Sequence, residues 1–252
     1  MDLFCATIIE LEEELRSCGC GIVLVDSHGQ PHRIALLAFA DDLVLFANSA
    51  AELQRALDIV AKWARRIRMR LNIGVTKSAY MCFGRGNPPQ SETATTLVLD
   101  GVPLPKVNVY KYLGVCIGSG GGDVKHLQLM CSKAATKTWE IASWAHHHNA
   151  TVDIATRLWH LYTSRALLYG SALLSAAPTT IAMLCSTQRV CGRILLGFSK
   201  TSPCPSVLAE LGWLPFTIHV DNERLRLFCR LLISPNALVH LALDCCAQYD
   251  CK

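Results

Sequence analysis

The sequence predicts an α+β fold in two parts: strands and helices alternate over residues 1–118, and residues 119–252 are helical throughout. In the first part, short apolar runs bounded by turn residues alternate with amphipathic segments. After the glycine-rich run at 118–122, apolar residues recur at the three- and four-residue spacing of helices. We therefore place the domain boundary between residues 118 and 119.

The first part is expected to begin with an amphipathic helix and a hairpin. Ile8, Leu11 and Leu15 recur at helical spacing near the N-terminus. The apolar run 21–25 then leads into Asp26-Ser27-His28-Gly29, a composition typical of a hairpin turn. We therefore interpret Asp26 as a turn residue rather than as a metal ligand.

Two adjacent aspartates, Asp41 and Asp42, stand between the apolar runs 34–40 and 43–47. Each run is typical of a short buried strand, so the runs should pair as an antiparallel hairpin with the aspartates at its turn. Charged side chains rarely stay beside a buried sheet unless they are paired or bind a metal. Because Asp is also common in ordinary turns, the pair alone leaves two interpretations open, a turn and a divalent-cation site.

A helix is predicted from about Ser49 to Arg68. Ser49 and Glu52 fit a capping box, and apolar residues repeat along one face. The other face carries cations, among them Lys62, Arg65 and Arg66. Such a face can follow a phosphate backbone, and it can equally be a solvated helix surface. The stretch that follows, 70–84, ends in the alternation of a strand.

Two further segments complete the first part. Asp100-Gly101 stands between apolar triplets and is a strong signal for a hairpin turn. The segment 109–115, Val-Tyr-Lys-Tyr-Leu-Gly-Val, has the character of a strand end.

The second part is expected to contain four main helices. The first two carry apolar residues over 127–141 and 154–168. The third should begin after Pro178 with Thr179 or Thr180 as its cap, and the fourth should run from about 216 to 233.

The order of these motifs resembles the reverse transcriptase domain of non-LTR (LINE-like) retrotransposons. Phe39-Ala40-Asp41-Asp42 matches the family's Phe/Tyr-Ala-Asp-Asp hairpin. Lys77-Ser78 and Phe83-Gly84 match its next stretch, although Arg70 stands where the family has glycine. Tyr112-Leu113-Gly114 is similar to the segment that holds the primer. Later, Tyr169-Gly170 and the run 210–215, Glu-Leu-Gly-Trp-Leu-Pro, are similar to parts of the family's thumb.

The resemblance implies the C-terminal half of a polymerase palm, with an antiparallel sheet, its Asp-Asp hairpin and packing helices, followed by an all-helical thumb-like bundle. It implies an RNA-directed DNA polymerase that transfers a nucleotide to a primer 3′-hydroxyl by two-metal chemistry. An RNA template, a DNA primer and deoxynucleoside triphosphates would be its partners, and Mg²⁺ or Mn²⁺ its cofactor. Asp41 and Asp42 would hold the metal, and Lys77 would act with them in catalysis by protonating pyrophosphate.

The same resemblance implies a set of nucleic-acid contacts. Phe39 would lie near the primer terminus, and Tyr112 and Gly114 would hold the primer strand. The full set expected to contact nucleic acid is Phe39, Lys62, Arg65, Arg66, Lys111, Tyr112 and Gly114.

One part of the family's site has no counterpart in this sequence. The family uses three carboxylates, and both the strand with the first and the Gln-Gly-x-Pro-x-Ser-Pro segment after it are missing. We therefore expect an incomplete domain without activity of its own. Two sources of the missing fingers and first palm strands stay open, a preceding part of the same polyprotein and another chain. The alternative is a non-catalytic remnant that binds nucleic acid or a partner. A prenyl transferase is disfavoured because Leu45 occupies the position of its third acid.

Composition sets broad limits. With 252 residues, of which 51% are hydrophobic, the chain can bury a substantial core. A net charge of +4 permits a nucleic-acid partner without requiring one. Thirteen irregularly spaced cysteines predict reduced thiols in the nucleus or cytoplasm, and no signal peptide or membrane span is expected. His240, Cys245, Cys246 and Cys251 match no zinc spacing well.

Overall fold

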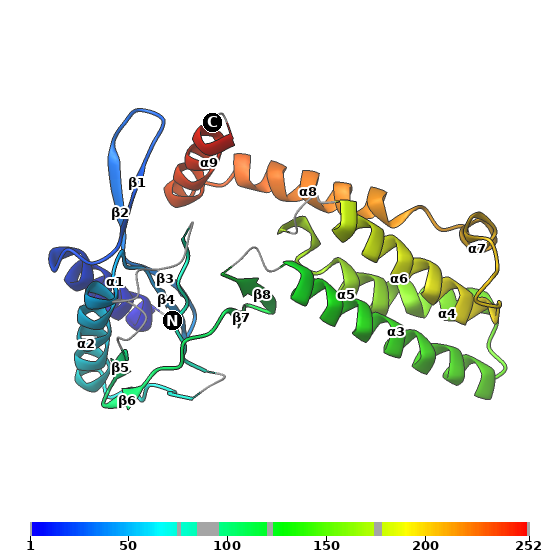
Figure 1. Cartoon of the computed structure of the whole chain (residues 1–252), viewed down its shortest axis with the longest axis horizontal. Coiled ribbons are helices and arrows are strands. Elements are labelled where there is room, and N and C mark those ends of the chain that lie inside the picture. The colour runs from blue at the N-terminus through cyan, green and yellow to red at the C-terminus, as the bar shows by residue number, and fades with distance from the viewer. Residues whose placement is uncertain (1, 75–76, 85–95, 120–122, 174–177, 251–252) are drawn as a thin grey trace. The chain divides into compact units, whose positions relative to one another are not determined.

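The computed structural model describes residues 2–74, 77–84, 96–119, 123–173 and 178–250 (Figure 1). Its contacts divide the chain into two compact units, residues 1–108 with 234–252, and residues 109–233. The predicted domain boundary at 118 stays a prediction, because compact units and sequence domains need not coincide. Residues 87–91, whose sequence Asn-Pro-Pro-Gln-Ser is typical of a loop, lie outside the described residues, as do residues 120–122 of the glycine-rich run and Cys251.

The first unit mixes helices with small antiparallel sheets, which fits the predicted α+β class. Its elements are α1 (Asp2–Ser17), β1 (Ile22–Val25), β2 (Pro31–Ile34), β3 (Leu36–Phe39), β4 (Asp42–Leu45), α2 (Ala50–Arg66), β5 (Val98–Leu99), β6 (Val102–Pro103) and α9 (Ala237–Asp250). Within the described residues, its strands form three separate antiparallel pairs, β1–β2, β3–β4 and β5–β6. The antiparallel sheet expected around the Asp-Asp hairpin is a two-stranded pair in the described residues, since β3 is paired with β4 alone.

Helix α2 buries its apolar face in the core of the first unit. Trp63 and Val60 from this helix pack with Leu11 and Leu15 of α1 and with Leu36 of β3. The indole Nε1 of Trp63 donates a hydrogen bond to a backbone carbonyl of α1 at 3.0 Å. This packing anchors the base of the β3–β4 hairpin, because Leu36 is only 6% exposed.

The N-terminus of α2 is capped as predicted. The Ser49 hydroxyl accepts a hydrogen bond from the Glu52 backbone N–H at 3.2 Å. The Glu52 carboxylate, which is 9% exposed, accepts from the backbone N–H of Asn48 at 3.1 Å and from that of Gly21 at 2.7 Å. Glu52 therefore ties the start of α2 to the residue that precedes β1, a contact that the capping-box pattern does not predict.

The second unit is a helical bundle preceded by one hairpin. Its elements are β7 (Val109–Tyr112), β8 (Val115–Gly118), α3 (Asp123–His147), α4 (Val152–Leu158), the π-helix η1 (Trp159–Ser164), α5 (Arg165–Leu168), the 3₁₀-helix η2 (Ser171–Leu173), α6 (Pro178–Leu196), α7 (Cys204–Glu210) and α8 (Phe216–Leu232). The predicted positions of the four main helices are confirmed. The predicted cap at Thr179 or Thr180 is wrong, because α6 already begins at Pro178, where a missing N–H costs little.

Two tryptophans lie in the core of the bundle. The rings of Trp159 and Trp213 stack with centroids 4.0 Å apart. The Trp159 indole donates to the Thr138 hydroxyl at 3.1 Å, and both side chains are buried. The Gln188 side chain donates to the carbonyl of Leu214 at 2.8 Å and accepts from the N–H of Phe216 at 2.9 Å. The segment 210–216 is thereby fixed in the bundle.

No single helix in the described part of the chain has both the length and the apolar composition of a membrane span. The successive helices α8 and α9 reach that length and composition only when they are taken together.

Candidate metal and nucleic-acid site

The predicted Asp-Asp hairpin is present. Strands β3 and β4 pair antiparallel with Phe39 opposite Asp42, so Ala40 and Asp41 form a two-residue loop. Ala40 has φ +51°, a left-handed conformation that a small side chain tolerates better than a β-branched one. Both strands are shorter than predicted: β3 begins at Leu36, since Ile34 is the last residue of β2, and β4 ends at Leu45.

The tip of the hairpin is open to solvent. Asp41 and Asp42 are exposed, and Phe39 beside them is 61% exposed. Leu36, at the other end of β3, is buried in the core. The hairpin therefore presents two carboxylates and an aromatic ring on a rigid base.

Asp41 and Asp42 suit a divalent cation in the kind of donor they supply. Carboxylate oxygens are the preferred ligands of Mg²⁺. In the part of the chain that the structure describes, however, no three His, Cys, Asp or Glu side chains are grouped so that they could hold a metal ion. The two carboxylates are therefore suitable ligands for a divalent cation, but no third ligand residue is grouped with them in the described residues.

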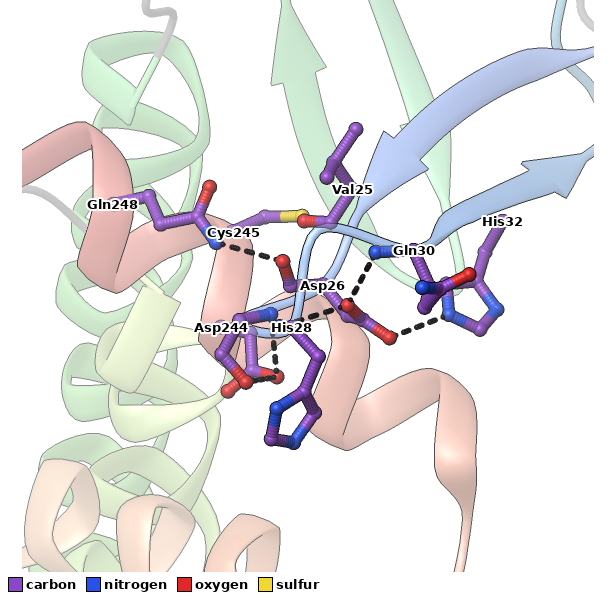
Figure 2. Close-up of polar contacts among 9 residues, drawn as sticks. Val25, Asp26, His28, Gln30, His32, Asp244, Cys245 and Gln248 are labelled. Atoms are coloured by element: carbon purple, nitrogen blue, oxygen red, sulfur yellow. Dashed lines mark hydrogen bonds and ion pairs between the residues drawn. The ribbon is translucent and has the colours of Figure 1, made fainter.

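Asp26 is a turn residue, as predicted. Its Oδ1 accepts the backbone N–H groups of His28 and Gln30 at 2.9 and 2.8 Å, and its Oδ2 lies 2.9 Å from Nε2 of His32. Figure 2 shows this carboxylate turned toward the loop and His32. The hydrogen bond from His32, followed by that from Gln30, holds the pKa of Asp26 below its ordinary value. Its oxygens are thus engaged within the β1–β2 hairpin.

Helix α9 contacts the tip of the same hairpin (Figure 2). The Ser27 hydroxyl donates to Oδ2 of Asp244 at 3.0 Å, and the Gln248 amide donates to the carbonyl of Asp26 at 3.1 Å. The Cys245 thiol donates to a carbonyl of β1 at 3.4 Å. These contacts attach residues 237–250 to the first unit.

The cysteines that the structure describes are free thiols. Of the residues weighed as zinc ligands, Cys245 contacts β1 and Nε2 of His240 lies 2.7 Å from the Ser234 carbonyl. The side chains of Cys245 and His240 each contact a backbone carbonyl.

Lys77 lies in a turn after α2 and is exposed. The backbone N–H groups of Lys77 and Ser78 donate to the carbonyl of Gly74 at 2.8 and 3.0 Å. The strand expected at the end of 70–84 is reduced to one isolated parallel bridge between Tyr80 and Lys106. A longer ladder is disfavoured because Pro105 has no N–H to donate.

The predicted basic face of α2 carries ion pairs. Arg65 pairs with Asp100 of the β5–β6 turn, and Arg66 pairs with Glu10 and Glu14 of α1. Lys62 is exposed and lines a shallow pocket that Asp100 also lines. These acids offset much of the local positive charge and favour the solvated-surface interpretation, since exposed ion pairs are individually weak. The phosphate-binding role of Lys62, Arg65 and Arg66 stays a prediction.

The Tyr-Leu-Gly segment forms the tight turn between β7 and β8. Tyr112 pairs with Val115, and the two loop residues, Leu113 and Gly114, have φ +46° and +84°. Lys111 is exposed on β7. This hairpin belongs to the second unit, so the residues predicted to contact nucleic acid are divided between the two units.

Sequence reasoning missed the residues that hold this turn. His126 and Tyr169 both form hydrogen bonds to the β7–β8 hairpin. In the sequence, Tyr169 stands only in a segment similar to a thumb motif, and His126 is one histidine on a long helix. No spacing pattern in the sequence connects either of them to residues 113–116.

Residues 3–117 match the family model described as reverse transcriptase (RNA-dependent DNA polymerase). The matched segment contains the Asp-Asp hairpin, α2 and the Tyr-Leu-Gly turn. This part of the chain is therefore similar to the reverse transcriptase family. Neither the curated proteins nor the solved structures provide a match to the chain.

Proposed function

We propose that residues 3–117 are part of the palm of an RNA-directed DNA polymerase of the non-LTR retrotransposon type, and that residues 119–252 are its thumb-like region. The observation that carries this proposal is the β3–β4 hairpin. Its base is buried, its tip exposes Asp41 and Asp42, and it lies inside the segment that matches the reverse transcriptase family. An ordinary surface turn does not require the buried base.

Asp41 and Asp42 would hold Mg²⁺ or Mn²⁺. When bound, the metal would supply positive charge that lowers the pKa of the primer hydroxyl and offsets charge on the phosphate oxygens. The chain's own part is to keep both carboxylates at the exposed tip of a hairpin with a buried base and to place the exposed Phe39 beside them. Lys77 would donate a proton to the leaving pyrophosphate, an effect worth about 10²–10⁴ in rate.

The proposed partners are an RNA template, a DNA primer and deoxynucleoside triphosphates. Lys111, Tyr112 and Gly114 would hold the primer strand, and the helical second unit would follow the duplex. Because two-metal sites are sensitive to ligand geometry, a further carboxylate from outside the described residues is required for full activity. The chain by itself is then a binding-competent but inactive part of the enzyme.

A non-catalytic role is the second candidate, and the incomplete donor set favours it. A remnant of this kind would bind nucleic acid through the second unit, and its affinity would be the same after Asp41→Asn. The polymerase proposal differs because divalent cation at Asp41 should strengthen binding of the primer end.

The proposal predicts salt-dependent binding of an RNA–DNA hybrid. Fluorescence anisotropy over a salt series should show affinity falling steeply, because bound cations are released from each phosphate that the protein contacts. Lys111→Ala should weaken binding and make the slope of log K against log salt shallower by about 1. Arg65→Ala should have a smaller effect, because its guanidinium is already paired with Asp100.

The matched control is Lys200→Ala, an exposed lysine of the same unit outside the proposed site. It should leave both affinity and slope unchanged. Absence of hybrid binding by the wild-type chain, or equal effects of Lys111→Ala and Lys200→Ala, would contradict the proposed nucleic-acid contacts.

A further inference from the structure

Tyr169 covers the Tyr-Leu-Gly turn. Its hydroxyl donates a hydrogen bond to the carbonyl of Leu113 at 2.5 Å. A Cβ added to Gly114 would lie 2.9 Å from Cε1 of the Tyr169 ring, so the ring rests directly on the glycine. Yet Tyr169 is 52% exposed, so this packing leaves much of the side chain open to solvent.

His126 fixes Tyr169 from the inside of the unit. It is 1% exposed, and its Nδ1 lies 3.3 Å from the backbone N–H of Cys116, from which it accepts. Its Nε2 lies 3.2 Å from the carbonyl of Tyr169, so the proton is on Nε2 and is donated there. One buried imidazole thus joins β8 to the end of α5.

Gly170 allows this close approach. It has φ +73°, and an added Cβ would lie 3.0 Å from Cγ2 of Val115 and 3.2 Å from Nε2 of His126. We name His126, Tyr169 and Gly170 the clasp. All its contacts with residues 113–116 lie within the second unit, so the turn is held by the helical bundle.

We propose that Tyr169 is a nucleic-acid-contacting residue, which the clasp orients so that its open ring is available to a base or ribose of the strand held by the β7–β8 hairpin. This inference rests on the proposed function. A tyrosine needed only for packing would gain most by becoming buried, and this one has its hydroxyl and main chain fixed while the residue stays 52% exposed.

The chemistry suits a nucleic-acid strand. An aromatic face stacks on any base without regard to sequence, and Lys111 on the same hairpin supplies a cation for phosphate. Because one hydrogen bond fixes the Tyr169 hydroxyl and another fixes its main chain, little conformational entropy is lost when a base stacks on the ring. His126 and Gly170 are then positioning residues that act through Tyr169.

The test measures binding of an RNA–DNA hybrid with a single-stranded overhang to the full chain. Tyr169→Ala should weaken binding about tenfold, since it removes a stacking surface. Tyr169→Phe keeps the ring and loses only its bond to Leu113, so affinity should fall about threefold. Tyr162→Ala is the matched control, because Tyr162 is similarly exposed at 59% on η1, and its affinity should equal that of the wild type.

Two measurements distinguish a role of Tyr169 and His126 in positioning the nucleic acid from a role in structural support alone. In a double-mutant cycle, Lys111→Ala should cost less in the Tyr169→Phe background than in the wild type, because the misaligned strand no longer reaches the lysine. His126→Gln, whose amide can replace the Nε2 donor, should retain more affinity than His126→Ala. Melting curves identify any variant that fails to fold, and Tyr169→Phe is expected to melt close to the wild type.

Each result of these measurements either supports or overturns the role of Tyr169 in binding nucleic acid. Loss of affinity in Tyr169→Ala with a non-additive cycle supports the inference. Unchanged affinity in Tyr169→Ala, or an additive cycle, overturns it while leaving the proposed function standing if Lys111→Ala still weakens binding. A wild-type chain that does not bind the hybrid overturns both.

Discussion

Gly21→Ala is expected to destabilise the first unit by about 3–5 kcal/mol. Gly21 has φ +110°, and an added Cβ would lie 2.5 Å from the carbonyl oxygen of Ile34 and 2.7 Å from Cα of Ala35. Both are backbone atoms at the passage from β2 to β3, so they cannot move aside without shifting the Asp-Asp hairpin. The substitution also endangers the 2.7 Å hydrogen bond from Gly21 to Glu52.

Chemical denaturation, with the free energy of unfolding taken from linear extrapolation, measures this effect. Gly29→Ala is the matched control: Gly29 has φ +80°, but an added Cβ meets nothing within 4 Å. It should lose only about 1 kcal/mol, the usual cost of a left-handed conformation. Equal losses in the two variants would show that the close approach at Gly21 does not constrain the fold.

Trp159→Ala should destabilise the helical bundle by about 3–5 kcal/mol. Trp159 is 1% exposed, stacks on Trp213 with centroids 4.0 Å apart, and donates to Thr138 at 3.1 Å. Its removal leaves a cavity under the segment 210–216 and takes away one of the two hydrogen bonds of the Thr138 hydroxyl, which still donates to the carbonyl of Ala134. Trp159→Phe, which keeps a ring, should lose clearly less.

Trp139→Ala is the control for this second substitution. Trp139 lies on α3 of the same unit and is 63% exposed, so its removal should change the free energy of unfolding by no more than about 0.5 kcal/mol. Thermal unfolding followed by circular dichroism compares the variants. A loss in Trp139→Ala as large as that in Trp159→Ala would mean that the stacked pair is not the centre of the bundle.

Local features of this fold were predictable from the sequence. Apolar runs on both sides of Asp41 and Asp42 predicted the hairpin, and Asp100-Gly101 predicted a turn whose two residues have φ +50° and +81°. The Ser49 cap followed from its residue type and spacing. In each case the physical cause lies within a few residues of the feature, where periodicity and turn chemistry act.

Contacts between distant residues were not predictable in this way. Glu52 reaches Gly21, Trp159 stacks on Trp213, and Tyr169 bonds Leu113 only because the tertiary fold brings these residues together. Arg65 looked like a free cation in the sequence, and the partner that pairs with it, Asp100, is supplied by a later hairpin. The sequence therefore predicted the two carboxylates of the candidate site. It did not predict the contacts between distant residues that hold the surrounding elements in place.

The central claim, that the Asp-Asp hairpin is a divalent-cation site, is tested most directly by a melting curve with and without Mn²⁺. A cation that binds the carboxylates of the folded hairpin stabilises the folded state by mass action. Mn²⁺ should raise the melting temperature of the wild type by about 2–4 °C and leave Asp41→Asn/Asp42→Asn unchanged. Asp153→Asn, an exposed carboxylate of the other unit, should respond like the wild type. An equal Mn²⁺ shift in the wild type and the double variant, or no shift in either, would contradict the claim.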